Sequence, residues 1–416
     1  MVSTRRVWLL VASLSLLIVG LAPAADSLNV RLVGWCSTGE APVGVVGLGD
    51  YAYIAVDGES ALRVISVADP AHPVEVGRCW TPDLAYDVAV VGDYAYLADN
   101  YEGLRIISVA DPTRPAEVGY CDTPGQPHGV TVDWQRALAY VADAPGGLRV
   151  VSIADPTDPV EIGSCVTSGR AWSVALDGDH AYVAADDAGL RVISIADPAH
   201  PIEVGHCDTE GSALDVVVAG SCAFVADGLG GLRFVSVSDP AKPAEIGYYD
   251  TPGGACGVEL DSSHEYAYVA DYDSGLRVIT TDFAHPTEVG YYLPAALNEA
   301  YDVAVLGVYA CVAVGGVEPG LQILQFYGGG VEETPNPEVR ATKCAPTLVR
   351  SVLFLAGSTN ASSSPSWLLD AAGRKVLDIR PGANDVSKVA PGVYFVRQAS
   401  SVMCGASSVT KVLIVR

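Results

Sequence analysis

The sequence predicts an all-β protein made of seven repeated units, each with four short strands, and three counts support this prediction. A phrase of the type GLRVIS returns seven times, starting at residues 61, 103, 147, 189, 231, 275 and 320, with spacings of 42 to 45 residues. A phrase of the type AYVAD also occurs seven times, and so does a Val-Gly or Ile-Gly pair. A period of about 40 to 50 residues with four strands per unit is typical of a β-propeller blade. We therefore predict a seven-bladed β-propeller over residues 26–327.

The second unit illustrates the four strands of a blade. Apolar segments rich in β-branched and aromatic residues run over residues 85–92, 93–99, 103–111 and 115–121. Turn residues such as Gly-Asp and Asp-Pro separate them, and Gly and Pro number 43 and 26 in the whole chain. This alternation of short apolar runs and turns favours strands over helices.

The two ends of the repeat region are incomplete in complementary ways. The segment VRLVGWC, residues 30–36, is a Val-Gly strand with no unit in front of it. The last unit stops at residue 327, after LQILQFY, without a Val-Gly strand of its own. We expect the N-terminal strand to complete the seventh blade and close the ring, because an open ring leaves an unpaired strand edge.

Composition narrows the class of partner. Half of the 416 residues are hydrophobic and 18% are charged, which is ample for a large core. The formal net charge is −25 at pH 7, from 24 Lys plus Arg against 49 Asp plus Glu. Nucleic acid and anionic membrane surfaces are therefore excluded as expected partners on electrostatic grounds.

The combination of GLRVIS, Asp-Pro turns, Glu-Val-Gly, DVAV and AYVAD resembles the LVIVD-repeat family of β-propellers, over residues 30–327. The resemblance implies a bacterial or archaeal propeller that works outside the cytoplasm. It carries over no catalytic residue.

Residues 1–25 have the order of regions expected of a secretory signal peptide. Arg5 and Arg6 precede an apolar run that ends in the small residues Ala22–Ala25. The run has about 15 residues, fewer than the roughly 20 that span a bilayer, so an uncleaved anchor is the weaker alternative. We expect a secreted or cell-surface bacterial protein whose mature chain has no membrane span.

A second, smaller domain is expected after the propeller. Residues 328–340 combine glycines, acidic residues and prolines and are interpreted as a linker. Residues 341–416 alternate strand-like segments and turns, which predicts a small C-terminal β-sandwich. The phrases LLDAAGRKVLDI, APGVYFVR and TKVLIVR resemble the C-terminal sorting domain of type IX secretion cargo. That resemblance implies the secretion machinery as a partner and removal of the domain at the surface.

Charged residues recur at fixed places in the repeat. Arg occurs in six units and Glu in six units, and the seventh unit has Gln322 and Leu32 in their places. The shared exception favours a cross-strand Arg–Glu pair within each blade over a ring of ligand-binding charges. The Arg residues are Arg63, Arg105, Arg149, Arg191, Arg233 and Arg277, and the Glu residues are Glu75, Glu117, Glu161, Glu203, Glu245 and Glu288.

Two other recurring types have a structural and a functional interpretation. Asp99, Asp143, Asp227 and Asp271 end the AYVAD phrase, where an Asp caps a turn by accepting backbone N–H groups. Calcium is the alternative, and only Asp186-Asp187 and Asp271-Tyr272-Asp273 approach a suitable loop. Cys36, Cys79, Cys121, Cys165 and Cys207 hold equivalent positions in different units, too far apart to bridge, and are interpreted as small buried hydrophobes. Cys344 and Cys404 are a plausible disulfide pair.

The candidate binding site lies where the chain enters the innermost strand of each blade. These positions vary between units although the strands repeat, as expected for a fixed scaffold with free loops. The predicted ligand-binding residues are Tyr86, Asp87, His128, Trp172, Asp215, Tyr301 and Asp302, and Leu214 and Cys256 hold two further positions of the set. Aromatic platforms with carboxylate acceptors suit a protein or glycan ligand. The alternative is that the aromatic side chains only plug the channel against water.

No catalytic motif supports an enzyme. The sequence has no G-x-S-x-G and no H-E-x-x-H, and its seven His residues are scattered. We therefore expect a non-catalytic binding scaffold without a cofactor. The alternative is a propeller hydrolase or lactonase with a metal in the central channel, held by Asp87, Asp215 and Asp302.

Overall fold

The computed structural model describes residues 26–58, 60–294 and 298–327, together with seven short strands between residues 347 and 414. The predicted signal peptide over 1–25, the linker over 328–340 and the proposed Cys344–Cys404 pair lie outside the described residues. By its internal contacts the chain divides into two compact units, Met1–Val331 and Glu332–Arg416. Each unit is described by itself.

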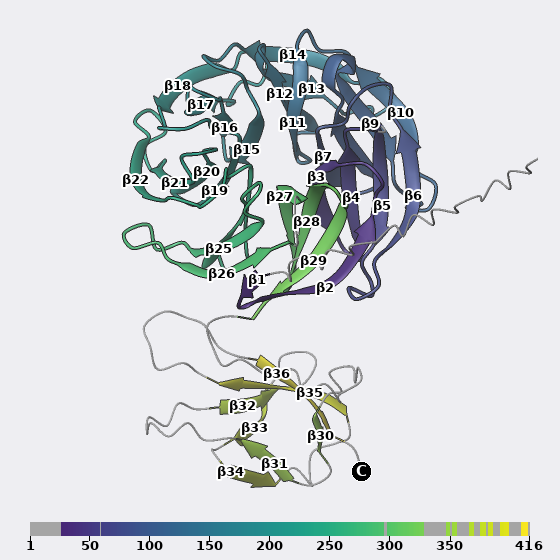
Figure 1. Ribbon diagram of the computed structural model, residues 1–416, viewed down its shortest axis with the longest axis vertical. Helices are drawn as coiled ribbons and strands as arrows, with labels where there is room; N and C mark the ends of the chain where they lie inside the picture. Colours follow the sequence, from purple (N-terminus) through teal and green to yellow (C-terminus); the bar gives the residue numbers. More distant parts are fainter. Residues whose placement is uncertain are drawn as a thin grey trace, which may run out of the picture. The chain divides into compact units, whose positions relative to one another are not determined.

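The first unit is a ring of seven antiparallel sheets, numbered here as blades 1 to 7 in chain order (Figure 1). Blade 1 contains β3 (Pro42–Leu48), β4 (Tyr51–Val56), β5 (Ala61–Ser66) and β6 (Val74–Trp80). Blade 2 contains β7 (Asp87–Val91), β8 (Tyr94–Ala98), β9 (Leu104–Ser108) and β10 (Ala116–Cys121), with a single 3-10 turn at Asn100–Glu102. Blade 3 contains β11 (Gln126–Asp133), β12 (Leu138–Ala144), β13 (Gly147–Ser152) and β14 (Val160–Cys165).

Blades 4 to 7 repeat this plan, which confirms the predicted seven-bladed architecture with four-stranded blades. Blade 4 contains β15 (Ser173–Asp177), β16 (His180–Ala184), β17 (Leu190–Ser194) and β18 (Ile202–Cys207). Blade 5 contains β19 (Asp215–Ala219), β20 (Cys222–Ala226), β21 (Leu232–Ser236) and β22 (Ala244–Tyr249). Blade 6 contains β23 (Gly257–Leu260), β24 (Tyr266–Ala270), β25 (Leu276–Thr280) and β26 (Glu288–Leu293).

Blade 7 is built from both ends of the propeller chain. It contains β27 (Asn298–Leu306), β28 (Tyr309–Gly316) and β29 (Gly320–Phe326), and its outermost strand is β2 (Val30–Ser37). Strand β2 runs antiparallel to β29, from the pair Val30 and Phe326 to the pair Ser37 and Gly320. The preceding strand β1 (Asp26–Leu28) pairs instead with β26 and adds a fifth strand to blade 6.

The hydrophobic core lies between blades. In the described residues, one buried cluster occupies each of the seven interfaces between neighbouring blades. Between blades 7 and 1, for example, Ile54 and Ile65 pack with Ala313 and Ile323. Neighbouring blades cover both faces of the inner strands of each blade. The side chains that point to either face are therefore apolar. This explains why phrases such as AYVAD read as continuous apolar runs.

The repeated Val-Gly phrase marks the place where one blade meets the turn of the next. Each outermost strand carries a register shift beside its repeated Gly, as at Glu117 and Gly119 in β10. A Cβ atom on Gly77 would lie 2.1 Å from the carbonyl oxygen of Pro112, and one on Gly119 would lie 2.2 Å from that of Pro156. Only glycine fits there, because the Asp-Pro turn of the following blade packs directly on the strand.

The predicted Arg–Glu pairs form in the six blades that contain them. The separations are 2.8 Å for Arg63–Glu75, 3.8 Å for Arg105–Glu117, 3.5 Å for Arg149–Glu161, 3.6 Å for Arg191–Glu203, 3.7 Å for Arg233–Glu245 and 3.3 Å for Arg277–Glu288. The structural interpretation is therefore confirmed.

The recurring Asp residues accept backbone N–H groups as predicted, but from a different turn. Asp143, fully buried, accepts from the N–H of Gly125 at 3.0 Å, in the loop that leads into its own blade. Asp227 does the same with Gly211 at 2.8 Å. Each of these Asp residues also pairs with the Arg of its blade, at 3.0 Å for Asp143 and Arg149. Sequence reasoning missed this second pairing.

The five equivalent cysteines are free and half-buried rather than fully buried. They pack at the edges of the clusters between blades; Cys165, for instance, packs against the cluster of blades 3 and 4. Each thiol lies 3.8 to 4.0 Å from the carbonyl oxygen of the next residue. Their role as small packing residues is borne out.

The second unit has a five-stranded sheet and a separate strand pair. The sheet has the order β30 (Thr347–Val349), β36 (Val409–Ile414), β35 (Gly392–Gln398), β32 (Ser366–Leu369) and β33 (Lys375–Ile379). The pair consists of β31 (Val352–Leu355) and β34 (Gly382–Asp385). Across the described part of both units, no helix is long and apolar enough to cross a membrane.

Candidate functional site

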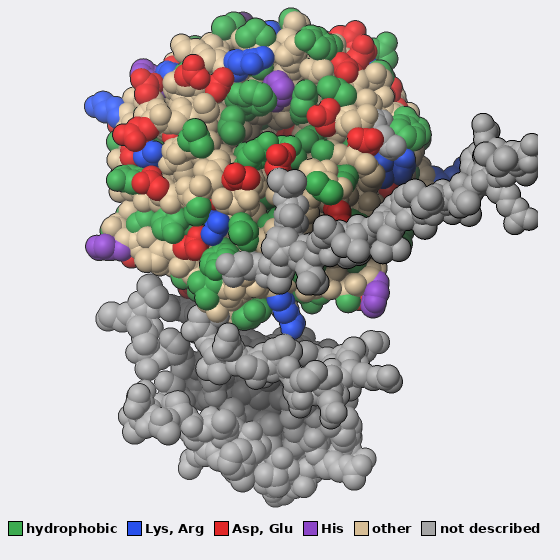
Figure 2. Space-filling model, in the orientation of Figure 1, with side chains coloured by type: hydrophobic (Ala, Val, Ile, Leu, Met, Phe, Trp, Pro, Cys, Tyr) green, Lys and Arg blue, Asp and Glu red, His purple; other side chains and the backbone are tan. Residues whose placement is uncertain are grey.

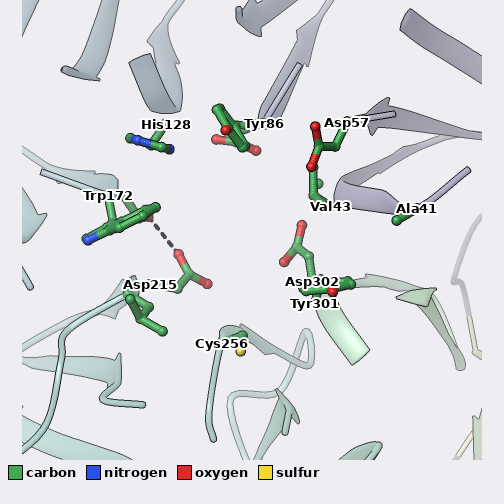
Figure 3. A pocket seen from close by; sticks show the side chains of 14 residues that line it. Ala41, Val43, Asp57, Tyr86, His128, Trp172, Asp215, Cys256, Tyr301 and Asp302 are labelled. Carbon is green, nitrogen blue, oxygen red and sulfur yellow. Dashed lines mark hydrogen bonds between the residues drawn. The ribbon is translucent and has the colours of Figure 1, made fainter. Parts of the chain in front are cut away.

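A cavity of about 410 Å³ opens at one end of the propeller channel, and all seven predicted site residues line it. Figure 3 shows the carboxylates of Asp215 and Asp302 pointing toward the middle of the cavity, with Tyr86, His128 and Trp172 along one wall. The remaining wall belongs to blades 1, 5, 6 and 7. The complete lining is Ala41, Val43, Gly44, Asp57, Tyr86, Asp87, His128, Trp172, Ser173, Leu214, Asp215, Cys256, Tyr301 and Asp302.

The aromatic wall is one continuous stack across blades 2, 3 and 4. The ring centroids of Tyr86 and His128 are 4.5 Å apart, and those of His128 and Trp172 are 4.2 Å apart. The guanidinium carbon of Arg170 lies 5.7 Å from the centroid of the Trp172 ring. Burial, together with the charge of Arg170, lowers the pKa of His128 to about 4. His128 is thus neutral at physiological pH and adds no positive charge to the cavity.

β-Bulges in the innermost strands set the direction of two of these side chains. In β11 the register shifts between Pro127 and Gly129, so His128 is the extra residue of a β-bulge. Tyr301 is the corresponding extra residue in β27, between Ala300 and Asp302. A bulge redirects one side chain without changing the rest of the strand. This is how a repeated strand presents a variable side chain at the cavity.

Tyr301 forms the opposite wall with the loop of blade 6. Its hydroxyl donates to the Glu299 carboxylate at 2.5 Å. Its ring meets that of Tyr272 at a centroid distance of 5.7 Å, nearly edge to face. Burial and the Glu299 charge raise the pKa of Tyr301, so the phenol stays protonated.

The three aspartates at the base of the cavity connect neighbouring blades. Asp87 accepts from the N–H of Val88 in its own strand at 2.7 Å and from the N–H of Val130 in the next blade at 2.8 Å. Asp302 repeats the pattern with Val303 and with Val45, both at 2.7 Å.

Asp215 follows the same rule and has one additional partner. It accepts from Val216 and from Val258 of the next blade, each at 2.8 Å, and from the Ser173 hydroxyl at 2.6 Å. Every carboxylate is therefore held rigidly by at least two donors. Fixed carboxylates facing a hollow are suited to recognise hydrogen-bond donors of a ligand.

Glycine alternates with these larger residues around the channel. The equivalent position is Gly44 in blade 1, Asp87 in blade 2, Gly129 in blade 3, Ser173 in blade 4, Asp215 in blade 5, Gly257 in blade 6 and Asp302 in blade 7. A Cβ atom on Gly44 would lie 2.9 Å from the Cα of Asp87 in the next blade. The innermost strands approach too closely there for any side chain, so glycine is required.

The carboxylates raise one another's pKa. Burial raises the pKa of Asp87 to about 6, with a smaller contribution from the charge of Asp215. Burial first, and then the charges of Asp215 and Asp87, raise the pKa of Asp302 well above its usual range. These effects arise because three carboxylates share one low-dielectric channel.

A fourth carboxylate lies two residues after Gly257, the channel position of blade 6. Glu259 of β23 occupies a position where the other six blades have Val46, Ala89, Thr131, Ala175, Val217 and Ala304. Its Oε1 accepts from the N–H of Leu260 at 2.8 Å. Burial, and then the charge of Asp215, raise its pKa from 4.5 to about 7. Sequence reasoning missed Glu259, although it is the only charged residue at this repeat position.

We expect Glu259→Gln to stabilise the propeller above neutral pH. A raised carboxyl pKa contributes stability that is fully present below pH 4.5 and is lost as the pH rises through about 7. The variant stays neutral, so its free energy of unfolding at pH 8 exceeds that of the wild type by about 1 to 3 kcal/mol. At pH 4 the two proteins are equally stable. Urea unfolding at both pH values measures this, with the exposed Glu265→Gln as control; a gain of the same size at both pH values contradicts the prediction.

Blade 1 contributes lining residues that the sequence prediction did not include. Ala41, Val43 and Asp57 all face the cavity. Val43 precedes Tyr86 by 43 residues, one repeat period, and this spacing was the available signal. Burial, and then the charges of Asp83 and Glu40, raise the pKa of Asp57.

A metal site needs several ligand side chains that converge on one point. Within the described residues, no group of three or more His, Cys, Asp or Glu side chains is placed to hold a metal ion. This covers Asp87, Asp215 and Asp302, and also the two calcium candidates at Asp186-Asp187 and Asp271–Asp273. Asp271 is instead engaged by the N–H of Gly253 at 2.9 Å and by Arg277 at 3.5 Å.

Solved structures with a similar fold include natural proteins and a computationally designed one. The β-propeller domain of Myceliophteria thermophila Cps50 (Swd1) matches with a TM-score of 0.59 and 12% identity, over 72% of this chain and 100% of that one. Chaetomium thermophilum Raptor matches with a TM-score of 0.59 and 12% identity, over 73% and 30%. The computationally designed Ika8 protein matches with a TM-score of 0.53 and 7% identity, over 71% and 99%. At these identities the likeness establishes the fold alone.

Sequence comparison identifies the repeat itself. No curated protein matches the chain. The family model described as the LVIVD repeat matches seven times, at residues 43–81, 84–123, 138–167, 168–209, 210–251, 252–293 and 298–323. These matches follow the seven blades and together cover more than half of the chain. The chain therefore belongs to the LVIVD-repeat family of β-propellers.

Proposed function

We propose that this protein is a secreted or cell-surface binding scaffold that holds a protein or glycan ligand, without catalysis, in the cavity at the channel mouth. One observation carries the proposal. The position before the channel residue holds a different kind of side chain in most blades, and these side chains together line one cavity. Positions that only maintain the scaffold repeat from blade to blade.

The chemistry of the cavity supports a binding role. One wall is the stack of Tyr86, His128 and Trp172, which offers flat apolar surface with polar edges. The base supplies rigid carboxylate acceptors. A volume of about 410 Å³ lies within the range of about 300 to 1,000 Å³ that is typical of ligand pockets.

We expect the double variant Trp172→Ala with Tyr301→Ala to lose ligand binding while its melting temperature stays nearly unchanged. Both side chains border the hollow, so their removal takes away ligand contacts and little core packing. Ligands selected from a displayed peptide library and from a glycan array on the wild-type chain provide the probes. Trp134→Ala, at a turn where the side chain is 68% exposed, is the control.

A plug gives the opposite result. If the aromatic side chains only seal the channel, the double variant melts at a much lower temperature and still binds the selected ligands. That pattern contradicts the binding site.

We also propose that the site needs no metal or cofactor. Elemental analysis of the purified chain tests this. A stoichiometric metal whose removal abolishes binding or a lactone-hydrolysing activity overturns the proposal and favours a metal-dependent hydrolase.

Export is proposed to use both ends of the chain. Residues 1–25 act as a cleaved signal peptide, and residues 341–416 act as a β-sandwich sorting domain that the secretion machinery reads. A chain that ends at Gly330 is expected to fold yet to stay off the surface of a host with the matching secretion system. Surface display of that shortened chain contradicts this role.

The N-terminal strand is proposed to close the ring. The pairing of β2 with β29 joins the first segment of the propeller to the last. Val30, fully buried, also packs into the cluster between blades 6 and 7.

A further inference from the structure

This chain pairs its buried carboxylates with arginine in four blades. Asp99, Asp143, Asp227 and Asp271 are fully buried, and each lies 3.0 to 3.5 Å from the Arg of its own blade. An unpaired buried charge is strongly destabilising, so this pairing is what physical chemistry demands.

The channel carboxylates lack such a partner. Among the described residues, no Lys, Arg or His forms an ion pair with Asp87, Asp215, Asp302 or Glu259. Their hydrogen bonds come from backbone N–H groups and from one serine hydroxyl. The cavity lining contains no Lys or Arg, although Arg170 lies 5.7 Å from the ring centroid of the lining residue Trp172. The three cavity carboxylates and Glu259 therefore have no ion-pair partner among the described residues.

The carboxylates keep capacity for further donors. Each oxygen of Asp87 and Asp302 accepts one backbone hydrogen bond, whereas a carboxylate oxygen can accept two. The oxygens are fixed in position and border the hollow. A ligand that donates several N–H groups can use this capacity in charge-assisted hydrogen bonds.

The aromatic wall favours the same kind of ligand. The faces of Tyr, Trp and neutral His rings attract cations through their negative quadrupole. Beyond the wall, Asp57 lies on the rim within the electrostatic reach of Asp83 and Glu40. Figure 2 shows acidic side chains among apolar ones around the centre of the propeller face. Such a rim attracts a basic partner and repels an acidic one.

The cavity has room for an occupant larger than a single ion. A volume of about 410 Å³ is more than ten times the roughly 30 Å³ share of one liquid water. No metal-holding group is found among the described residues. An extended side chain with a cationic end fills the space and reaches the carboxylates.

We propose that the cavity holds the guanidinium or ammonium group of an Arg or Lys side chain presented by a protein partner, with its hydrocarbon part against the stack of Tyr86, His128 and Trp172. This inference rests on the proposed function and narrows its ligand class from a protein or glycan to a basic protein segment. The N–H donors of the cation face Asp87, Asp215 and Asp302.

Isosteric probes test the charge directly on the unmodified full chain. The probes are N-acetyl-arginine amide and N-acetyl-citrulline amide, measured by isothermal calorimetry at low salt. We expect the arginine probe to bind at least about tenfold more tightly, because only it carries the charge. We also expect the affinity to weaken as salt is added. A displayed peptide library is expected to enrich sequences with one fixed Arg or Lys.

Substitutions of the cavity carboxylates test whether the arginine probe binds in the cavity. Asp215→Asn and Asp302→Asn are each expected to weaken the arginine probe by at least about tenfold. Asp187→Asn removes the same charge from an exposed loop position and is expected to leave binding unchanged. If either channel variant fails to fold, the arginine and citrulline comparison on the wild type still decides.

The failures of the two proposals can be told apart. Ligands that are lost in Trp172→Ala but bind equally well with and without a cationic group overturn the basic ligand and leave the binding site standing. Selected ligands that are unaffected by Trp172→Ala overturn both proposals.

Discussion

A chain that begins at Ser37 is expected to lose most of its propeller stability. Its truncation removes β1 and nearly all of β2, so the edge of β29 loses its partner from Leu321 to Phe326. It also removes Val30, which is fully buried between blades 6 and 7, and Val33 and Cys36, which pack between blades 7 and 1. Two of the seven interfaces are weakened together, and we expect the melting temperature to fall by more than about 10 °C.

A shorter truncation tests whether the loss of stability comes from the loss of β2 or only from the shortening of the chain. A chain that begins at Val30 loses β1 and the Asn29 side-chain bond to the Val289 carbonyl, but it retains β2. We expect it to melt within a few degrees of the intact chain. Thermal unfolding followed by circular dichroism measures both chains. Equal melting of the intact chain and the chain that begins at Ser37 contradicts closure by β2.

Replacing the buried Arg of one blade is expected to have the second largest effect. Arg233 is 4% exposed and lies 3.4 Å from Asp227, 3.7 Å from Glu245 and 3.5 Å from Glu210. Its guanidinium carbon also lies 4.9 Å from the centroid of the Tyr248 ring. Arg233→Met leaves Asp227 buried without a countercharge, and such a change costs about 3 to 5 kcal/mol.

Removing both charges is expected to restore much of this loss. In the double variant Arg233→Met with Asp227→Asn, the amide oxygen still accepts from Gly211 and no buried charge remains. Blade 7 shows that uncharged residues are compatible with the fold at the positions of Asp227, Arg233 and Glu245. The equivalent residues there are Val314, Gln322 and Leu32. Urea unfolding of both variants completes a double-mutant cycle. A double variant less stable than Arg233→Met refutes the charge argument.

Arg31→Met is the surface control for this cycle. Arg31 is exposed and hydrogen-bonds the Gln325 side chain at 2.7 Å. We expect a change below about 0.5 kcal/mol, as is usual for surface substitutions.

Features that recur with the repeat could be read from the sequence, and single departures from it could not. The seven units, the four strands and the Arg–Glu pairs each occur six or seven times, so periodicity alone identifies them. The pairing of Asp227 with Arg233 escaped prediction because an Asp at a strand end also fits a simple turn cap. Glu259 escaped because it has no counterpart in the other blades.

The same distinction between repeated features and single departures applies to the residues that line the cavity. The positions before the innermost strands were identified by alignment of the units, so the seven predicted residues converge as the repeat implies. Val43 was missed because it is neither polar nor aromatic, and Asp57 because it follows β4, outside the entry positions on which the prediction was based. They lie close together because β3 and β4 form a hairpin, in which the N–H of Asp57 donates to the Ala41 carbonyl at 3.2 Å.

The alternation around the channel has a consequence of simple arithmetic. A closed ring with an odd number of members cannot alternate small and large residues throughout, so seven blades force at least one neighbouring pair of the same kind, either two glycines or two larger residues. The chain has one such pair, Ser173 beside Asp215, and there the Ser173 hydroxyl donates to the carboxylate at 2.6 Å. The two larger residues that the odd number of blades places side by side are thus joined by a hydrogen bond. This pair distinguishes blades 4 and 5 from the other neighbouring blades of a nearly symmetric ring. A ring with an even number of blades could alternate without any such pair.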